Sequence, residues 1–180
     1  MTQTSESGFS YIDVMIAIVI LTVGVLALLA GLSSAVVSAR GQNQQMVAKQ
    51  IATSTMESIM SVKETDPARL GWDAIGNVGS NIVNSIPRGI FLSGFQTVMS
   101  DAGPDEVLGT IDDNGTVVPL VQRRIIVTDI CDPDRPSPNC PTPGLARVRM
   151  RSVQVIVSYT VGTMQRQEVV RTVMTDYAKN

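Results

Sequence analysis

The stretch Gly8-Phe9-Ser10-Tyr11-Ile12-Asp13 decides the fold, because it opens an apolar run that carries no further charge until Arg40. The 26 residues from 14 to 39 are uncharged, and as a helix at 1.5 Å per residue they would measure roughly 39 Å. The hydrocarbon core of a bilayer is about 30 Å thick. The run therefore predicts a membrane helix. A carboxylate inside such a helix needs a partner, so Asp13 is a candidate functional residue.

The junction resembles the processing site of type IV prepilins and the related pseudopilins. In that family a short polar leader ends in glycine, phenylalanine follows, and an acidic residue stands four positions later. Gly8, Phe9 and Asp13 match this pattern, and the apolar residues 23–32 are similar to those of PilV-type minor pilins. The family prefers Glu where this chain has Asp13. Its leaders usually carry Lys or Arg, whereas residues 1–8 of this chain contain neither. The orientation in the membrane therefore follows from the resemblance and not from flanking charge.

The resemblance implies a route of maturation and assembly. A prepilin peptidase would cut between Gly8 and Phe9 and methylate the new amine of Phe9. The protein would first lie in the inner membrane with its head in the periplasm, and an assembly platform would then move it into a pilus at the cell surface. Asp13 would pair with the amine of a neighbouring pilin subunit, since low dielectric strengthens attraction between charges. The alternative is a simple signal anchor in which Asp13 lies at the interface without a role.

We expect five segments in the 180-residue chain. They are a cleaved leader (1–8), the transmembrane and filament-core half of a long helix (9–39), its amphipathic half (40–63), a connector (64–105) and a β-sheet head (106–180).

The amphipathic half contains no proline and places apolar side chains near one face of a helix. These residues are Ala48, Ile51, Ala52, Met56, Ile59 and Met60. We predict one helix from Phe9 to Lys63. The alternative is two helices broken at Gly41, because glycine in a helix interior costs up to about 1 kcal/mol.

Glycine and proline punctuate the connector, which predicts an irregular segment. Four aliphatic residues could support one short helix there: Ile75, Ile82, Val83 and Ile86. Three aromatic residues, Trp72, Phe91 and Phe95, are predicted to anchor the connector to the head. Aromatic residues make up 4% of the chain, so a stacking platform for a ligand is the less favoured alternative.

Three long β-branched runs, 116–130, 146–161 and 164–177, predict strands, and Val161-Gly162-Thr163 joins the last two as a hairpin. A weaker strand is predicted near 106–111, before a turn at Asn114-Gly115.

One face of the second run is apolar, and we expect it to pack on the amphipathic half of the helix. It consists of Val153, Val155, Val157 and Tyr159. The prediction is an α+β fold in which the long N-terminal helix packs on an antiparallel sheet of three or four strands. The resemblance implies the same type IV pilin-like arrangement.

Cys131 and Cys140 lie in a polar, proline-rich segment that predicts a short disulfide-closed loop outside the cytoplasm. Redox catalysis would favour a Cys-x-x-Cys pair, and zinc would need more ligands.

Acidic residues gather around glycine turns in the head and offer the oxygen ligands that calcium prefers. The first candidate set is Asp101, Asp105, Asp112 and Asp113. A second, weaker set is Asp129, Asp132 and Asp134. The alternative is that these side chains form ordinary solvated turns.

The charge balance argues against a nucleic-acid partner, because the net charge is −2 and removal of Glu6 with the leader changes it to −1. The chain contains no histidine, the commonest general base and metal ligand. We therefore expect a non-enzymatic structural subunit, a minor pilin, with no cofactor beyond the candidate calcium. The alternatives are a pseudopilin of a type II secretion system and a membrane-anchored, adhesin-like head.

Overall fold

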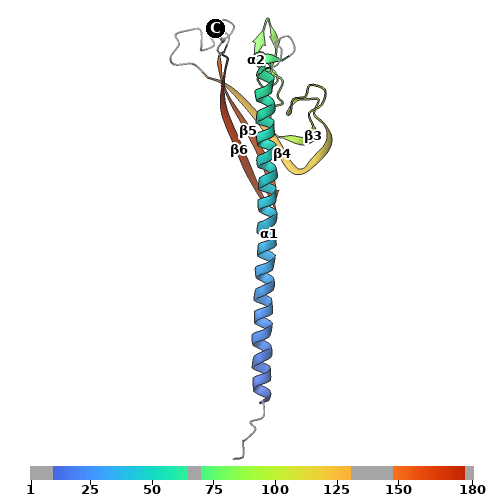
Figure 1. The fold of residues 1–180 in the computed structure, drawn as a ribbon, viewed down its shortest axis with the longest axis vertical. Helices are drawn as coiled ribbons and strands as arrows, with labels where there is room; N and C mark the ends of the chain where they lie inside the picture. Colours follow the sequence, from blue (N-terminus) through green and yellow to red (C-terminus); the bar gives the residue numbers. More distant parts are fainter. Residues whose placement is uncertain (1–9, 65–69, 131–147, 177–180) are drawn as a thin grey trace, which may run out of the picture. The chain divides into compact units, whose positions relative to one another are not determined.

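The computed structural model describes residues 10–64, 70–130 and 148–176 (Figure 1). The chain forms two compact units, which meet in sequence between Gln42 and Asn43, inside the first helix.

Helix α1 (Tyr11–Glu64) is 54 residues long. Ser10 caps its first turn, because the Ser10 Oγ accepts a hydrogen bond from the Ile12 N–H (3.4 Å) and the Asp13 carboxylate accepts one from the Ser10 N–H (3.3 Å). This reciprocal pattern resembles a capping box with Asp at N3, except that the serine hydroxyl bonds the N2 amide in place of the N3 amide. The helix continues through Gly41, so the alternative of two helices broken there is wrong.

In the second unit, one stripe of α1 is buried. It consists of Ala48, Ala52, Thr55, Met56, Ile59 and Val62. Of the six residues predicted for the apolar face of the helix, four are buried, which confirms the prediction for them: Ala48, Ala52, Met56 and Ile59. Ile51, the fifth, is half-buried. Met60 is 46% exposed, because it lies roughly 100° around the helix from the buried Ile59.

The sheet has four antiparallel strands in the order β3-β4-β5-β6. They are β3 (Gln96–Asp101), β4 (Asn114–Ile130), β5 (Met150–Val161) and β6 (Met164–Thr175). A two-residue turn joins β5 to β6 with Val161 opposite Met164, and Gly162 has φ +62°, which glycine adopts without steric cost. The predicted α+β fold, with its long helix and antiparallel sheet, is confirmed.

The first strand of the sheet is not where the sequence predicted it. Residues 106–111 form turns, and β3 occupies residues that were predicted to belong to the connector. The backbone of the 106–111 segment cannot join a ladder, because aspartate side chains accept hydrogen bonds from the N–H groups of Val107 and Gly109. Glu106 also has a positive φ of 60°.

The connector folds into short elements. Helix α2 (Gly71–Ala74) precedes a small antiparallel hairpin of β1 (Ile82–Val83) and β2 (Ile86–Pro87). The predicted helix across these aliphatic residues is wrong. Asn84 and Ser85 have φ values of 50° and 64°, as a tight hairpin turn with two positive-φ residues requires.

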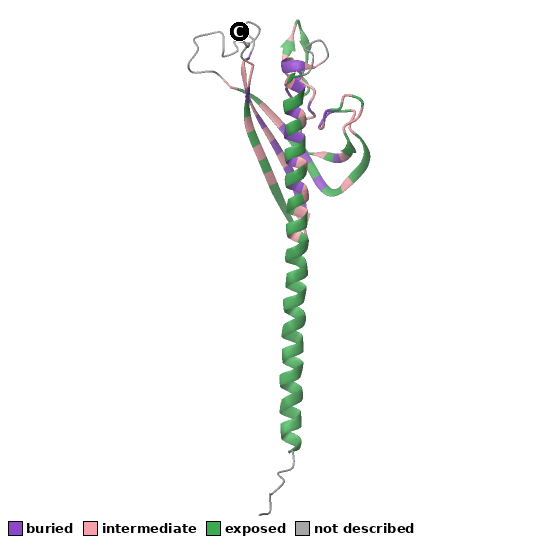
Figure 2. Ribbon diagram, in the orientation of Figure 1, coloured by how far each residue is buried: buried purple, intermediate pink, exposed green. Residues whose placement is uncertain are grey.

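The core of the second unit lies between α1 and the sheet, where the buried residues concentrate (Figure 2). The apolar face predicted for β5 is confirmed, because Val153, Val155 and Val157 are 0% exposed and Tyr159 is 2% exposed. Trp72 and Phe91 are buried as predicted. Phe95 is exposed, and the Arg124 guanidinium lies 5.9 Å from its ring centre, so its prediction as an anchor is wrong.

Candidate functional site

The first unit presents a continuous apolar helical surface. Every residue from Ser10 to Arg40 is exposed, including large side chains such as Leu21 (68%) and Leu28 (75%). Among the described residues, α1 is the one helix long and apolar enough to cross a membrane. Exposed apolar surface of this extent is typical of a membrane or protein interaction site.

Two of the four polar side chains inside this apolar run, Thr22 and Ser33, form hydrogen bonds within the helix. The Thr22 hydroxyl donates to the Ile18 carbonyl (2.7 Å), and the Ser33 hydroxyl donates to the Leu29 carbonyl (2.9 Å). A polar group in hydrocarbon is costly unless it has such a partner. These two hydroxyls therefore do not prevent lipid or a second apolar helix from covering the surface.

Asp13 lies in the first turn of this helix, and its side chain accepts the Ser10 N–H of its own chain. Its capping role was missed in the sequence, although Ser10-x-x-Asp13 is a readable signal. Pairing of Asp13 with a neighbour's amine stays a prediction. Gly8 and Phe9 lie outside the described residues.

The four residues of the first candidate calcium set lie at the end of β3 and in the loop that joins β3 to β4, and each accepts a backbone hydrogen bond. Asp101 accepts from Gly103 (2.8 Å), Asp105 from Val107 (2.8 Å), Asp112 from Asp105 (3.1 Å) and Asp113 from Gly109 (3.0 Å). This arrangement favours the interpretation of these residues as turn formers.

No group of three or more acidic, cysteine or histidine side chains is placed to hold a metal within residues 10–64, 70–130 and 148–176. Calcium binding stays a prediction. In the weaker candidate set, Asp129 is paired with Arg151 (3.1 Å), and Asp132 and Asp134 lie outside the described residues.

Two carboxyl groups of this loop have shifted pKa values. Hydrogen bonds, chiefly the one donated by the Thr110 hydroxyl (2.6 Å), lower the pKa of Asp112. Desolvation by burial is the main cause that raises the pKa of Asp105. The contribution of Asp112 to stability is present at neutral pH and is lost as the pH falls through its lowered pKa. The contribution of Asp105 to stability has the opposite pH dependence. It is present at low pH and is lost as the pH rises through the raised pKa of Asp105.

A buried ion pair ties the loop to the sheet and to the helix. The Arg123 side chain is 2% exposed and the Asp113 side chain is 8% exposed, and the two form a salt bridge. Arg123 also donates to the Thr55 hydroxyl of α1 (3.2 Å). Burial lowers the pKa of Arg123, and the charge of Asp113 opposes that shift. The sequence signal that was missed is a charged residue at an inward position between Val121 and Ile125.

A second buried arginine holds the connector against the sheet. Arg151 donates to the carbonyl oxygens of Trp72 and Ile75, and its guanidinium lies 4.7 Å from the centre of the Trp72 ring. The indole N–H of Trp72 donates to the Val148 carbonyl (2.7 Å). Trp72 and Phe91 thus pack inside the head and offer no open stacking surface to a ligand. Cys131 and Cys140 lie outside the described residues.

Comparison with known proteins finds no matching family model, no matching curated protein and no matching solved structure.

Proposed function

We propose that this protein is a structural subunit of a type IV pilus, of the minor PilV type, with no catalytic role. One observation carries the proposal. The exposed apolar surface of residues 10–39 begins directly after the Gly8-Phe9 junction. Such a surface suits lipid before assembly and the apolar helices of other subunits afterwards.

The position of Asp13 supports the same function. Its carboxylate is exposed at the start of α1, with no basic residue before Arg40 in its own chain. A carboxylate in an apolar environment needs a positively charged partner. The methylated amine of Phe9 in a neighbouring subunit would supply this charge, and pairing would set the register between adjacent helices.

The packing of the second unit also fits a subunit that carries a rigid head. Residues 43–64 of α1 bury one stripe against the four-stranded sheet. Arg123 and Arg151 fix the loop and the connector to that core. The head can therefore keep its own structure while the exposed apolar surface changes its surroundings.

Processing tests this proposal. We expect a host with prepilin peptidase to remove residues 1–8 and to leave a methylated Phe9, detectable by intact-mass and N-terminal peptide analysis. Gly8→Leu should retain the leader, because a bulky residue does not fit a site that takes glycine. Gly24→Leu is the matched control, since an added Cβ at Gly24 meets nothing within 4 Å. A mature Gly8→Leu protein, or a native N-terminus at Ser10 or beyond, would contradict the proposal.

A further inference from the structure

The sheet opens at one end, where β4 leaves β5. The last residue pair between these strands is Val121 with Tyr159, although β5 continues to Val161. Among the described strands, Thr160 and Val161 pair with β6 alone. Successive residues of a strand direct their backbone groups to opposite sides. One of these two residues therefore presents its N–H and C=O toward the space that β4 has left.

A bulge in β4 creates this space. Thr97 and Met99 of β3 are two residues apart in sequence. The β4 residues that they pair with, Gln122 and Val117, are five residues apart. Leu120, within the bulge, has φ +62° and is 66% exposed. A bulky residue rarely adopts this conformation, and such strain concentrates at binding and active sites. The strained backbone keeps a large apolar side chain at the mouth of the opening.

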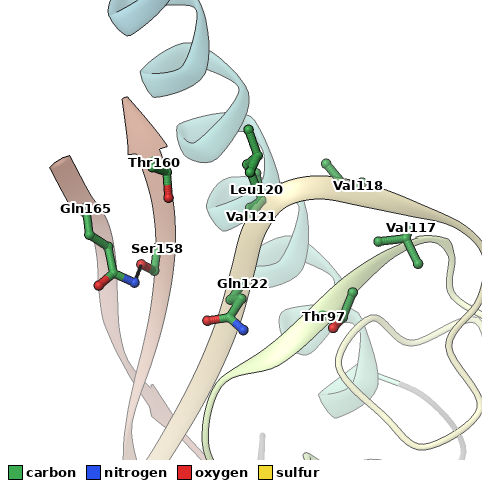
Figure 3. Close-up of a pocket in the computed structure, with 9 residues that line it drawn as sticks. All are labelled: Thr97, Val117, Val118, Leu120, Val121, Gln122, Ser158, Thr160 and Gln165. Atoms are coloured by element: carbon green, nitrogen blue, oxygen red, sulfur yellow. Dashed lines mark hydrogen bonds between the residues drawn. The ribbon is translucent and has the colours of Figure 1, made fainter. Parts of the chain in front are cut away.

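A pocket of about 260 Å³ occupies the opening (Figure 3). Its lining includes Val117, Leu120, Gln122, Ser158, Thr160 and Gln165. Ser158 is 2% exposed, and its hydroxyl accepts a hydrogen bond from the Gln165 amide (2.8 Å). The pocket thus has an apolar wall on β4 and an uncharged polar floor on β5 and β6.

We propose that this pocket binds a short, uncharged, extended peptide segment of a partner protein. The segment would pair through its backbone with the free end of β5, as in strand addition to a sheet edge. An apolar side chain of the segment would pack on Val117 and Leu120. None of the lining residues is charged, which disfavours phosphate or carboxylate ligands, and none is aromatic, which disfavours a sugar held by stacking.

The test uses the full chain in detergent micelles and an acetylated, amidated pentapeptide of alternating threonine and valine. We expect saturable NMR shifts of the Leu120, Thr160 and Val161 amides. The same peptide with alternate backbone amides N-methylated should bind at least tenfold more weakly, because it cannot pair along a strand. Maltotetraose, an uncharged sugar, should produce no saturable shifts.

Gln122→Trp should fill the pocket and weaken binding at least tenfold. Thr128→Trp is the control, because Thr128 is exposed on the same strand and face outside the lining. Each of the following results would overturn the proposal: no saturable shift with the peptide, equal binding of the N-methylated peptide, or shifts confined to the outer edge of β6. Saturable binding of the sugar at these residues would overturn it in favour of a carbohydrate site. The assay measures the isolated protein, so it can fail or succeed independently of pilus assembly.

Discussion

At the scale of single residues, the head depends on charges that are buried in pairs. Arg123 contacts both Asp113 of the loop and Thr55 of the helix, so it joins three parts of the second unit. A buried ion pair adds little net stability compared with a good apolar replacement, but loss of one partner leaves an uncompensated charge. The stability of the head is therefore sensitive to substitution of either member of the pair.

Asp113→Ala should lower the free energy of unfolding by about 3 to 5 kcal/mol, because it leaves Arg123 buried without its partner. The single tryptophan, Trp72, is 3% exposed in the head, so its fluorescence during urea unfolding reports on this unit. Asp101→Ala is the control in the same loop, since Asp101 is exposed and accepts one hydrogen bond. It should cost about 1 kcal/mol or less. Equal losses in both variants would contradict the proposed role of the buried pair.

Asp13 caps its own helix, and this observed role has to be separated from its proposed pairing with a neighbour's amine. Asp13→Ala should be inserted and cleaved but should enter filaments poorly, while Asp13→Glu should be incorporated nearly as well as the native protein. The measurement is the ratio of sheared-filament protein to membrane protein by immunoblot. Ser10→Ala removes the hydroxyl that caps Ile12 while keeping the carboxylate, so it controls for capping. Equal incorporation of the alanine variant at position 13 would show that pairing is not needed.

At the scale of elements, α1 changes its surroundings along its length. Its first part is exposed and apolar all round, and its second part buries one stripe against the sheet. The stripe includes Ala48 and Ala52, both 0% exposed, and their small side chains allow the helix backbone to approach the strands. A single helix thus combines an exposed apolar surface with a stripe that packs inside its own chain.

The neighbouring residues Ile59 and Met60 test the position of the stripe. Ile59→Ala should destabilise the head by about 2 to 5 kcal/mol, because it removes a fully buried side chain and leaves a cavity. Met60→Ala should change the stability by no more than about 0.5 kcal/mol, since Met60 is 46% exposed. Urea unfolding followed by Trp72 fluorescence measures both. A larger loss for Met60→Ala would mean that the helix packs through another face.

At the scale of the whole molecule, the proposed export and assembly would require a stable head. The protein is expected to leave the membrane without unfolding, and the sequence suggests a disulfide and a calcium site as additional stabilising features. The first lies outside the described residues. The second has its candidate ligands engaged in loop hydrogen bonds.

The exported protein should contain a bond between Cys131 and Cys140, and a Cys131→Ser, Cys140→Ser double variant should lose about 2 to 3 kcal/mol of stability. The measurement is thermal melting of the full chain in detergent, together with thiol titration of the exported protein. Free thiols in that protein would contradict the prediction. Addition of a chelator should leave the melting temperature unchanged, and a calcium-dependent rise that Asp112→Ala abolishes would instead establish a calcium site.

Sequence pattern alone was enough to predict the long helix, the last three strands and the apolar face of β5. These features follow from local periodicity, because a period of 3.6 or of two residues already selects the face that must be buried. The hairpin turn at Gly162 is equally local. The apolar run of residues 14–39 needed no tertiary context, since its length and lack of charge suffice to predict a helix that avoids water.

The tertiary structure alone decided the position of β3, the fold of the acidic loop and the burial of Arg123. Residues 106–111 resemble a strand in composition, but side chains of Asp105 and Asp113 take their backbone N–H groups. Arg123 is buried only because Asp113 and Thr55 meet it from other elements. The opening between β4 and β5 likewise depends on a bulge whose register is set by β3. Such features depend on partners that are distant in sequence, and the local sequence pattern does not identify these partners.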